Sequence, residues 1–336
     1  MKNVTIKDIA KHAGVSIATV SRVVNQNYKV SIKTRECVQK SIDELGYVQN
    51  SVARSLKVLS TFTIGLVVSD IGNAYFTAVA KALEDTIRSE KYNLIVCSTE
   101  GKKEKEKEYL NLLISKKVDG LVINTTGKND EFIAEISRRI PMVLINRKII
   151  NERFMGDFVD SNNFEGGYDL AKHLLEYGHK KIGIINGEMI LSTAKERFEG
   201  VKMAFSDYGI SMNESYYFGG DFTRNTGEEG AKYLLGLKNR PTAIIAMNNA
   251  IGIGFLKYIV NNQIDIPNDV SFAVYGNIEN SELFFTRPSH VTLNPMYVGA
   301  KAGQVLIERI ANLEITNREI IFSAKFIGGS SVKKVE

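Results

Sequence analysis

The chain has 336 residues, of which 44% are hydrophobic, and its formal net charge is +5. This length predicts two or three domains with a sizeable core. No apolar run reaches the ~20 residues that span a bilayer, and the polar N-terminus has no apolar signal segment. Two cysteines predict no disulfide framework, and four scattered histidines show no metal-ligand spacing. We therefore expect a soluble cytoplasmic protein without a metal or another cofactor.

The first sixty residues predict a helix-turn-helix. Thr5 and Asp8 can form a capping box that begins a first helix, and Gly14 supplies the positive φ of the following turn. Ser16 caps a second helix over residues 17–24. The exposed side of this helix carries small residues and one long cation, namely Ile17, Ala18, Ser21 and Arg22. Such a surface fits a DNA major groove, because little bulk separates the helix backbone from the base edges.

Positive charge is concentrated in the same part of the chain. Residues 1–60 hold ten Lys or Arg and four acidic residues, a net charge of +6. Since the whole chain carries +5, the remaining residues sum to −1. This separation is typical of a unit that contacts phosphates.

Two further segments complete the N-terminal region. Ser31 caps a third helix over residues 32–45, which Gly46 ends. Residues 51–57 then form barely two helical turns, and an isolated helix of that length is marginal in water. We expect this segment to become ordered only on binding something, or against a copy of itself.

From residue 62 onwards, short β-branched runs alternate with helical patterns, which predicts parallel sheets covered by helices on both faces. The series restarts near residue 161, so we expect two doubly wound subdomains facing one another across a cleft. Ligands in such folds bind at the carboxyl ends of the strands. The expected strands are 62–68, 92–97, 120–123, 142–145, 157–160, 182–186, 243–247, 270–275 and 290–293. The expected helices include 76–90, 103–116, 163–177, 194–208 and 227–237.

These patterns divide the chain into three parts: a headpiece over 1–48, a short helix and linker over 49–61, and a core over 62–336. Within the core, we expect a first subdomain of about 62–160 plus 290–320. The second subdomain then covers about 161–289 plus 321–330. The fold class is α/β, preceded by an all-α headpiece.

No catalytic motif emerges, so we do not expect an enzyme. There is no Walker A sequence and no Gly-x-Ser-x-Gly elbow. Residues 252–257 lack the third glycine of a dinucleotide fingerprint and lie in a helical pattern. The charged run over residues 102–108 is expected to be the solvated start of a helix.

The whole chain resembles the LacI/GalR family of bacterial transcription regulators. The most specific matches are at residues 4–10, 13–16, 19–25 and 51–56. Weaker matches follow in family order at residues 197–200, 220–222, 240–243 and 266–270. The resemblance implies a DNA-binding headpiece, a hinge helix and a core of the periplasmic sugar-binding type.

The resemblance also implies which residues contact DNA. Positions matching Ile17, Ala18 and Arg22 read the major groove in this family, whereas hydroxyl and amide side chains contact phosphates. Leu56 matches the hinge leucine that wedges into the minor groove and bends the duplex. The expected set is Thr5, Ser16, Ile17, Ala18, Thr19, Ser21, Arg22, Asn25, Ser31, Thr34, Asn50, Ala53, Arg54, Leu56 and Lys57. Paired hinges require a homodimer and a near-palindromic operator, although Gln49 replaces the proline usual before Asn50.

By the same resemblance, a small-molecule effector lies in the cleft. The expected contacts are Asn73, Tyr75, Phe76, Arg147, Asp160, Arg197, Phe222, Asn249 and Asn277. Three amides stand where the family usually has a carboxylate: Asn146, Asn249 and Asn277. Loss of these acids beside the two arginines favours an anionic effector, such as a sugar phosphate, sugar acid or keto acid, over a neutral hexose. The acidic side chain of Asp160 argues instead for a neutral effector.

The leading hypothesis is a dimeric transcriptional repressor whose affinity for double-stranded operator DNA is controlled by this effector. A second hypothesis is a regulator controlled by a protein corepressor docked on the first subdomain. A transport binding protein or an α/β enzyme is a third. The missing signal segment argues against the transport protein, and the missing catalytic residues argue against the enzyme.

Overall fold

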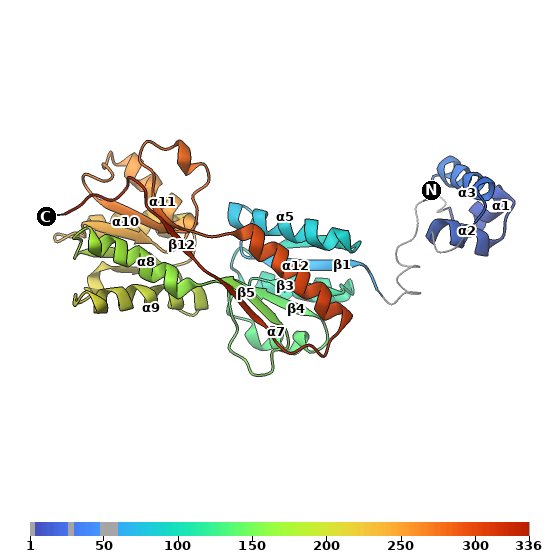
Figure 1. The fold of residues 1–336 in the computed structure, drawn as a ribbon, viewed down its shortest axis with the longest axis horizontal. Coiled ribbons are helices and arrows are strands. Elements are labelled where there is room, and N and C mark those ends of the chain that lie inside the picture. The colour runs from blue at the N-terminus through green and yellow to red at the C-terminus, as the bar shows by residue number, and fades with distance from the viewer. Residues whose placement is uncertain (1–3, 26–29, 48–59, 336) are drawn as a thin grey trace. The chain divides into compact units, whose positions relative to one another are not determined.

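The computed structural model describes residues 4–25, 30–47 and 60–335, and the chain divides into two compact units, Met1–Thr61 and Phe62–Glu336 (Figure 1). No helix in the described part is long and apolar enough to cross a membrane. We describe each unit by itself.

The described part of the first unit contains three short helices, as predicted: α1 (Ile6–Ala13), α2 (Ile17–Asn25) and α3 (Ile32–Leu45). The carboxylate of Asp8 accepts hydrogen bonds from the Thr5 backbone N–H at 2.8 Å and from its hydroxyl at 2.7 Å. Gly14 takes φ 65° and ends α1, so the turn depends on a residue without a Cβ. The core of this unit consists of Ile9, Ala10, Val20, Val23 and Val38.

The second unit contains two parallel sheets, each part of a subdomain with helices on both faces. The first sheet has the order β11-β5-β4-β3-β1-β2. Its strands are β1 (Thr63–Val68), β2 (Asn93–Ser98), β3 (Gly120–Ile123), β4 (Met142–Ile145), β5 (Asp157–Ser161) and β11 (Glu319–Phe322). One face packs against α5 (Ala74–Ser89) and α12 (Pro295–Ala311), and the other against α6 (Lys103–Ser115) and α7 (Asp130–Ser137).

The second sheet has the order β12-β10-β9-β8-β6-β7, in which only the edge strand β12 runs antiparallel to its neighbour. Its strands are β6 (Ile182–Asn186), β7 (Tyr217–Gly219), β8 (Ala243–Ala246), β9 (Ser271–Tyr275), β10 (Ser289–Thr292) and β12 (Lys325–Ile327). One face packs against α8 (Asn163–Glu176) and α9 (Ser192–Asp207), and the other against α10 (Arg224–Leu235) and α11 (Asn249–Asn261). Two short 3₁₀ helices, Glu214–Tyr216 and Ser281–Leu283, lie in loops of this subdomain.

The expected boundary near residue 290 is wrong by a few residues. Strand β10 lies in the second sheet, and Val291 is buried in that subdomain's core. The chain therefore crosses between subdomains after β5, after β10 and after β11. The three-residue strands β7 and β12 and the four-residue strand β11 were not predicted, because edge strands this short lack a long apolar run.

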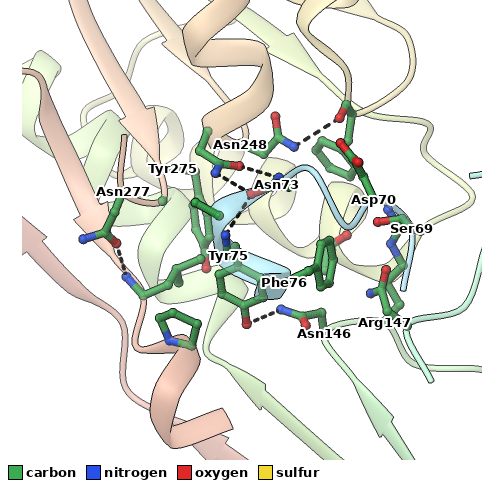
Figure 2. A pocket seen from close by; sticks show the side chains of 18 of the residues that line it. Ser69, Asp70, Asn73, Tyr75, Phe76, Asn146, Arg147, Asn248, Tyr275 and Asn277 are labelled. Carbon is green, nitrogen blue, oxygen red and sulfur yellow. Dashed lines mark hydrogen bonds between the residues drawn. The ribbon is translucent and has the colours of Figure 1, made fainter. Parts of the chain in front are cut away.

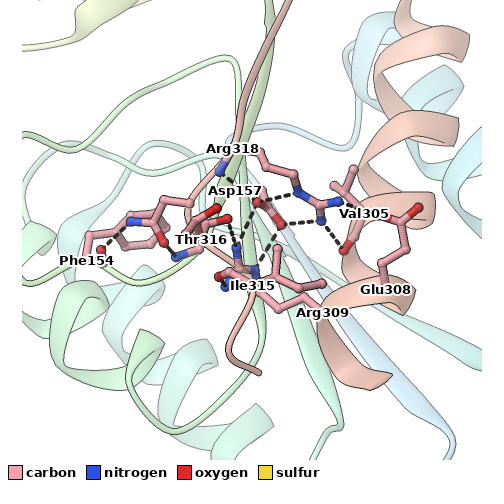
Figure 3. A network of polar contacts seen from close by, with 10 residues as sticks. Phe154, Asp157, Val305, Glu308, Arg309, Ile315, Thr316 and Arg318 are labelled. Atoms are coloured by element: carbon pink, nitrogen blue, oxygen red, sulfur yellow. Dashed lines mark hydrogen bonds and ion pairs between the residues drawn. The ribbon is translucent and has the colours of Figure 1, made fainter. Parts of the chain in front are cut away.

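A buried ionic network holds the C-terminal return of the chain against the first sheet (Figure 3). Asp157 is fully buried at the start of β5, and its carboxylate accepts hydrogen bonds from Arg309 of α12 at 2.8 and 2.9 Å. Arg318, which precedes β11, donates to the same carboxylate at 3.0 Å. Arg309 also donates to the backbone carbonyls of Ile315 and Thr316. The network thus ties α12, the connecting segment and β11 to β5.

Candidate DNA-binding and effector-binding sites

The predicted base-reading face lies on α2. Ile17 is 46% exposed, Ala18 and Arg22 are exposed, and Ser21 is partly buried. The opposite side of the helix supplies Val20 and Val23 to the core. Packing therefore leaves the small residues and the cation of α2 on its outer side.

Two predicted phosphate-contacting pairs lie at helix N-termini. The Thr19 backbone N–H donates to the Ser16 hydroxyl oxygen at 3.1 Å, and the two hydroxyl oxygens are 2.8 Å apart. Ser31 and Thr34 repeat this arrangement at the start of α3, with distances of 3.2 and 2.7 Å. All four residues lie at first turns, where free backbone N–H groups and the helix dipole favour anions.

Other predicted DNA contacts lie outside what the structure describes. Asn25 ends α2, but its side chain is not described. The hinge predictions fall in the stretch 48–59, which is also outside the described residues: Asn50, Ala53, Arg54, Leu56 and Lys57.

The predicted effector residues surround a cavity of about 300 Å³ between the two subdomains of the core (Figure 2). Its walls are loops and helix starts that follow strand carboxyl ends, as expected for this fold class. Eight of the nine predicted residues line it: Asn73, Tyr75, Phe76, Arg147, Arg197, Phe222, Asn249 and Asn277. Asn277 is exposed, and its amide oxygen accepts a hydrogen bond from the Leu293 backbone N–H at 2.9 Å.

Asp160 differs from the expectation, because it does not line this cavity. It is 2% exposed and accepts hydrogen bonds from the Asn163 amide at 2.6 Å and the Ser161 backbone N–H at 2.7 Å. Burial raises the pKa of the Asp160 carboxyl to about 7. Asp160 is therefore a buried residue of β5, near the point where the chain crosses to the second subdomain. Because it does not line the cavity, it no longer argues for a neutral effector.

Two buried arginines face the same aromatic ring from opposite subdomains. The guanidinium carbon of Arg147 lies 5.9 Å from the Phe222 ring centroid, and that of Arg197 lies 5.6 Å from it. Arg197 also lies 3.8 Å from the ring centroid of Tyr275. Burial, with repulsion from Arg197, lowers the pKa of Arg147 to about 10. Arg147 nevertheless remains cationic at neutral pH.

Backbone carbonyls, rather than carboxylates, hold the two arginines. Arg147 donates to the Thr125 carbonyl at 2.7 Å. Arg197 donates to the Met247 carbonyl at 2.6 Å and to the Asn163 amide oxygen at 2.8 Å. A Cβ on Gly167 would lie only 2.1 Å from the Arg197 carbonyl oxygen, so the close packing of α8 on α9 requires glycine there. Among the described residues, neither guanidinium forms an ion pair with a carboxylate.

Sequence reasoning missed Asn124 and Thr193 and considered Asn146 only as a replaced carboxylate, not as an effector contact. All three residues line the cavity, and each carries a buried oxygen without a hydrogen-bond partner in the described structure. Asn124 follows β3 directly, so its place after an apolar strand was a usable signal. Asn146 takes φ 60° and donates to the Tyr75 hydroxyl at 2.7 Å. Unpartnered buried oxygens are costly, so these three suit a polar ligand.

The charged run at the start of α6 is not wholly solvated, which corrects the expectation. Glu106 is fully buried, and its carboxylate accepts bonds from the Thr126 backbone N–H and hydroxyl, each at 2.7 Å. The Asn129 amide donates to it at 2.8 Å. Glu106 thus holds the loop that places Asn124 in the cavity wall and the Thr125 carbonyl against Arg147.

Comparison with known proteins gives the family. Residues 5–50 match the profile of bacterial regulatory proteins of the lacI family, and residues 61–329 match that of periplasmic binding proteins and the sugar-binding domain of the LacI family. The chain belongs to the LacI family. It is a DNA-binding transcriptional regulator with a ligand-binding core.

Individual relatives agree with this family assignment. The HTH-type transcriptional repressor PurR of Mannheimia succiniciproducens is 34% identical over 98% of this chain and 99% of the relative. A LacI-family regulator from Enterococcus faecium with bound ribose is 25% identical over 82% of this chain and 100% of that one, with TM-score 0.72. The Lac repressor dimer bound to operator and an anti-inducer shares the fold, with TM-score 0.85 and 21% identity over 99% of this chain and 100% of that one.

Proposed function

We propose that this regulator is a repressor that binds a near-palindromic operator as a homodimer, with an affinity controlled by a small polar anion in the cleft. The repressor assignment is supported by the relatives named PurR repressors. The exposed face of α2 and the hydroxyl pairs at the starts of α2 and α3 supply base-reading and phosphate-positioning groups.

The observation that carries the effector proposal is the pair of buried arginines, 8% and 6% exposed, that converge on Phe222 without a carboxylate partner among the described residues. Two cations in a buried wall favour a carboxylate or phosphate, which each guanidinium can bind bidentately. The polar side chains of Asn124, Asn146 and Thr193 line the same cavity and suit the hydroxyl groups of such a ligand. A sugar phosphate or sugar acid satisfies both requirements.

A thermal-shift panel on the full-length protein tests this proposal, using glucose 6-phosphate, gluconate and pyruvate against glucose and ribose. We expect an anionic compound to raise the melting temperature. Arg147→Gln should remove that shift, whereas Lys195→Gln, at an exposed position on α9, should leave it unchanged. Stabilisation by neutral sugars only would overturn the anionic effector. Stabilisation by nothing in the panel would favour the alternative control by a protein corepressor.

The homodimer is supported by exposed apolar side chains at two places in the core. Ile95 and Val96 are 37% and 39% exposed on β2, which forms an edge of the first sheet. Leu283 and Phe285 are 78% and 108% exposed in the second subdomain. An exposed apolar edge strand is a pairing surface, so we expect Val96→Lys to shift the protein from dimer to monomer in sedimentation experiments. Lys107→Glu, at an exposed position on α6, serves as the control.

We further propose that the chain acts in the cytoplasm, where its operator DNA lies, and that it has no catalytic activity. The names of its relatives as transcriptional repressors support both statements. Recovery of every panel compound unchanged after prolonged incubation with the protein checks the second statement.

A further inference from the structure

Two asparagines from opposite subdomains bind one another across the cleft (Figure 2). The Asn73 amide nitrogen donates to the Asn249 amide oxygen at 3.1 Å, and the Asn249 amide nitrogen donates to the Asn73 amide oxygen at 2.8 Å. Asn73 follows β1 of the first subdomain, and Asn249 follows β8 of the second. Each side chain therefore both donates to and accepts from the other subdomain.

Helix starts fix the orientation of both amides. As N-cap of α5, Asn73 accepts a hydrogen bond from the Tyr75 backbone N–H at 3.0 Å through the same oxygen that faces Asn249. The Asn249 oxygen likewise accepts from the Ala250 backbone N–H at 3.0 Å. Rotating either amide by half a turn would place its NH₂ group against a backbone N–H. The nitrogen of each amide is therefore directed at the oxygen of the other.

We propose that Asn73 and Asn249 form an interdomain clasp that positions the two subdomains around the cleft, and that they do not read the effector. This inference refines the proposed function by removing two residues from the effector contacts. Of the lining side chains, Asn124, Asn146 and Thr193 each keep a buried oxygen without a partner, and we assign ligand recognition to the lining residues outside the pair, above all to the arginines. Widening the cleft at the clasp breaks two hydrogen bonds at once.

The clasp requires an amide at both positions. A carboxylate only accepts hydrogen bonds, so an aspartate at residue 249 would keep the bond from Ala250 but could not donate to Asn73. Its second oxygen would then face the Asn73 oxygen. Among the described residues, two other polar contacts link the loops on the two sides of the cleft. They are the Lys128–Glu188 ion pair and the hydrogen bond from the Lys148 backbone N–H to the Ser192 hydroxyl, both 2.9 Å. Neither is altered by a change at residue 249.

Hydrogen–deuterium exchange on the full-length protein without ligand tests the clasp. Asn249→Asp preserves the helix cap, so we expect the variant to fold. Exchange should become at least threefold faster at residues 73–76, which lie in the other subdomain and keep their own hydrogen bonds. The reciprocal variant Asn73→Asp should accelerate exchange at residues 248–252 in the same way.

Asn277→Asp is the matched control, because it introduces the same charge into the same cavity wall without touching the pair. Equal exchange at residues 73–76 in Asn249→Asp and Asn277→Asp would overturn the proposal.

A second measurement is a double-mutant cycle of urea unfolding with Asn73→Ala and Asn249→Ala. We expect the double variant to lose less than the two single variants combined, and additive losses would contradict the clasp. Both experiments are made without ligand, so a result against the clasp does not contradict the anionic effector. A negative result in the thermal-shift panel likewise does not contradict the clasp.

Discussion

The helix-turn-helix and the cleft both contain arginines, but they are built in different ways, and the cleft lining also includes the carboxylates of Asp70 and Glu279. On α2, Arg22 is exposed, and the side chains that accompany it come from one continuous helix. In the cleft, Arg147 and Arg197 are buried and come from different subdomains, 50 residues apart in the chain. An exposed cation is screened by salt, whereas a buried one is screened much less. The first arrangement suits an extended polyanion such as DNA, and the second suits a single small anion.

The two regions also differ in what keeps them in place. The headpiece depends on caps and turns within a few residues, and its core has five buried hydrophobic residues. The core depends on contacts between distant segments, such as the network around Asp157 and the loop held by Glu106. We therefore expect single substitutions to cost more in the core, and four predictions test this difference.

The largest effect is expected for Asp157→Asn. This change removes the only carboxylate charge that faces Arg309, which is itself buried, in the described network. Breaking a buried ion pair from one side costs about 3–5 kcal/mol of unfolding free energy. Urea unfolding measures it. Glu308→Gln removes the exposed partner of Arg318 and should cost less than about 1 kcal/mol, and equal losses in the two variants would contradict the buried network.

The next effect is a pH dependence produced by Asp160. Because burial raises the pKa of this carboxyl to about 7 in the folded state, its protonated form is favoured by folding. The associated stability is fully present below pH about 4 and is lost as pH rises through about 7. We expect Asp160→Asn to flatten this decline by roughly 2–4 kcal/mol in unfolding experiments between pH 5 and pH 8. An unchanged slope would show that Asp160 ionises normally in the fold. Asp130 has a pKa raised to about 6 by burial and contributes with the same sign, so the comparison must be made between variant and parent.

A smaller effect, confined to DNA binding, is expected for Arg22→Ala. Loss of one base contact costs about 1–3 kcal/mol, which lowers operator affinity roughly tenfold to a hundredfold while stability stays unchanged. Fluorescence anisotropy with an operator recovered by sequence selection measures it. Lys40→Ala on α3 removes an equal exposed charge and is the control. An identical loss for the two variants would mean that Arg22 contributes only charge.

The smallest effect is expected for Ser31→Ala, which removes the hydroxyl that accepts from the Thr34 backbone N–H. Loss of such a cap costs about 1 kcal/mol. Thermal unfolding of the headpiece transition should shift accordingly. Ser115→Ala, at the end of α6 rather than at its start, serves as a comparison in the core. A larger loss for Ser115 would reverse the expected reliance of the headpiece on local caps.

The three described helices of the headpiece could be predicted from local sequence signals. Thr5, Gly14, Ser16 and Ser31 act on backbone groups within four residues, so the three helices could be predicted close to their observed ends. Alternating strands and helices determined the doubly wound class as well, because a parallel strand is apolar throughout. The family resemblance also indicated Arg147, Arg197 and Phe222 as cleft residues, and these line the cavity.

The folded structure determines how the candidate side chains are used. It places Asp160 behind the wall, buries Glu106 within a charged run and pairs Asn73 with Asn249 across 176 residues. No local pattern encodes such pairings, because burial and hydrogen-bond partners depend on segments that meet only when both subdomains are folded. The helix caps satisfy backbone groups a few residues away, whereas the cleft satisfies side chains from opposite subdomains. Contacts between neighbouring residues can therefore be predicted from the sequence, whereas contacts between distant segments are seen only in the folded structure.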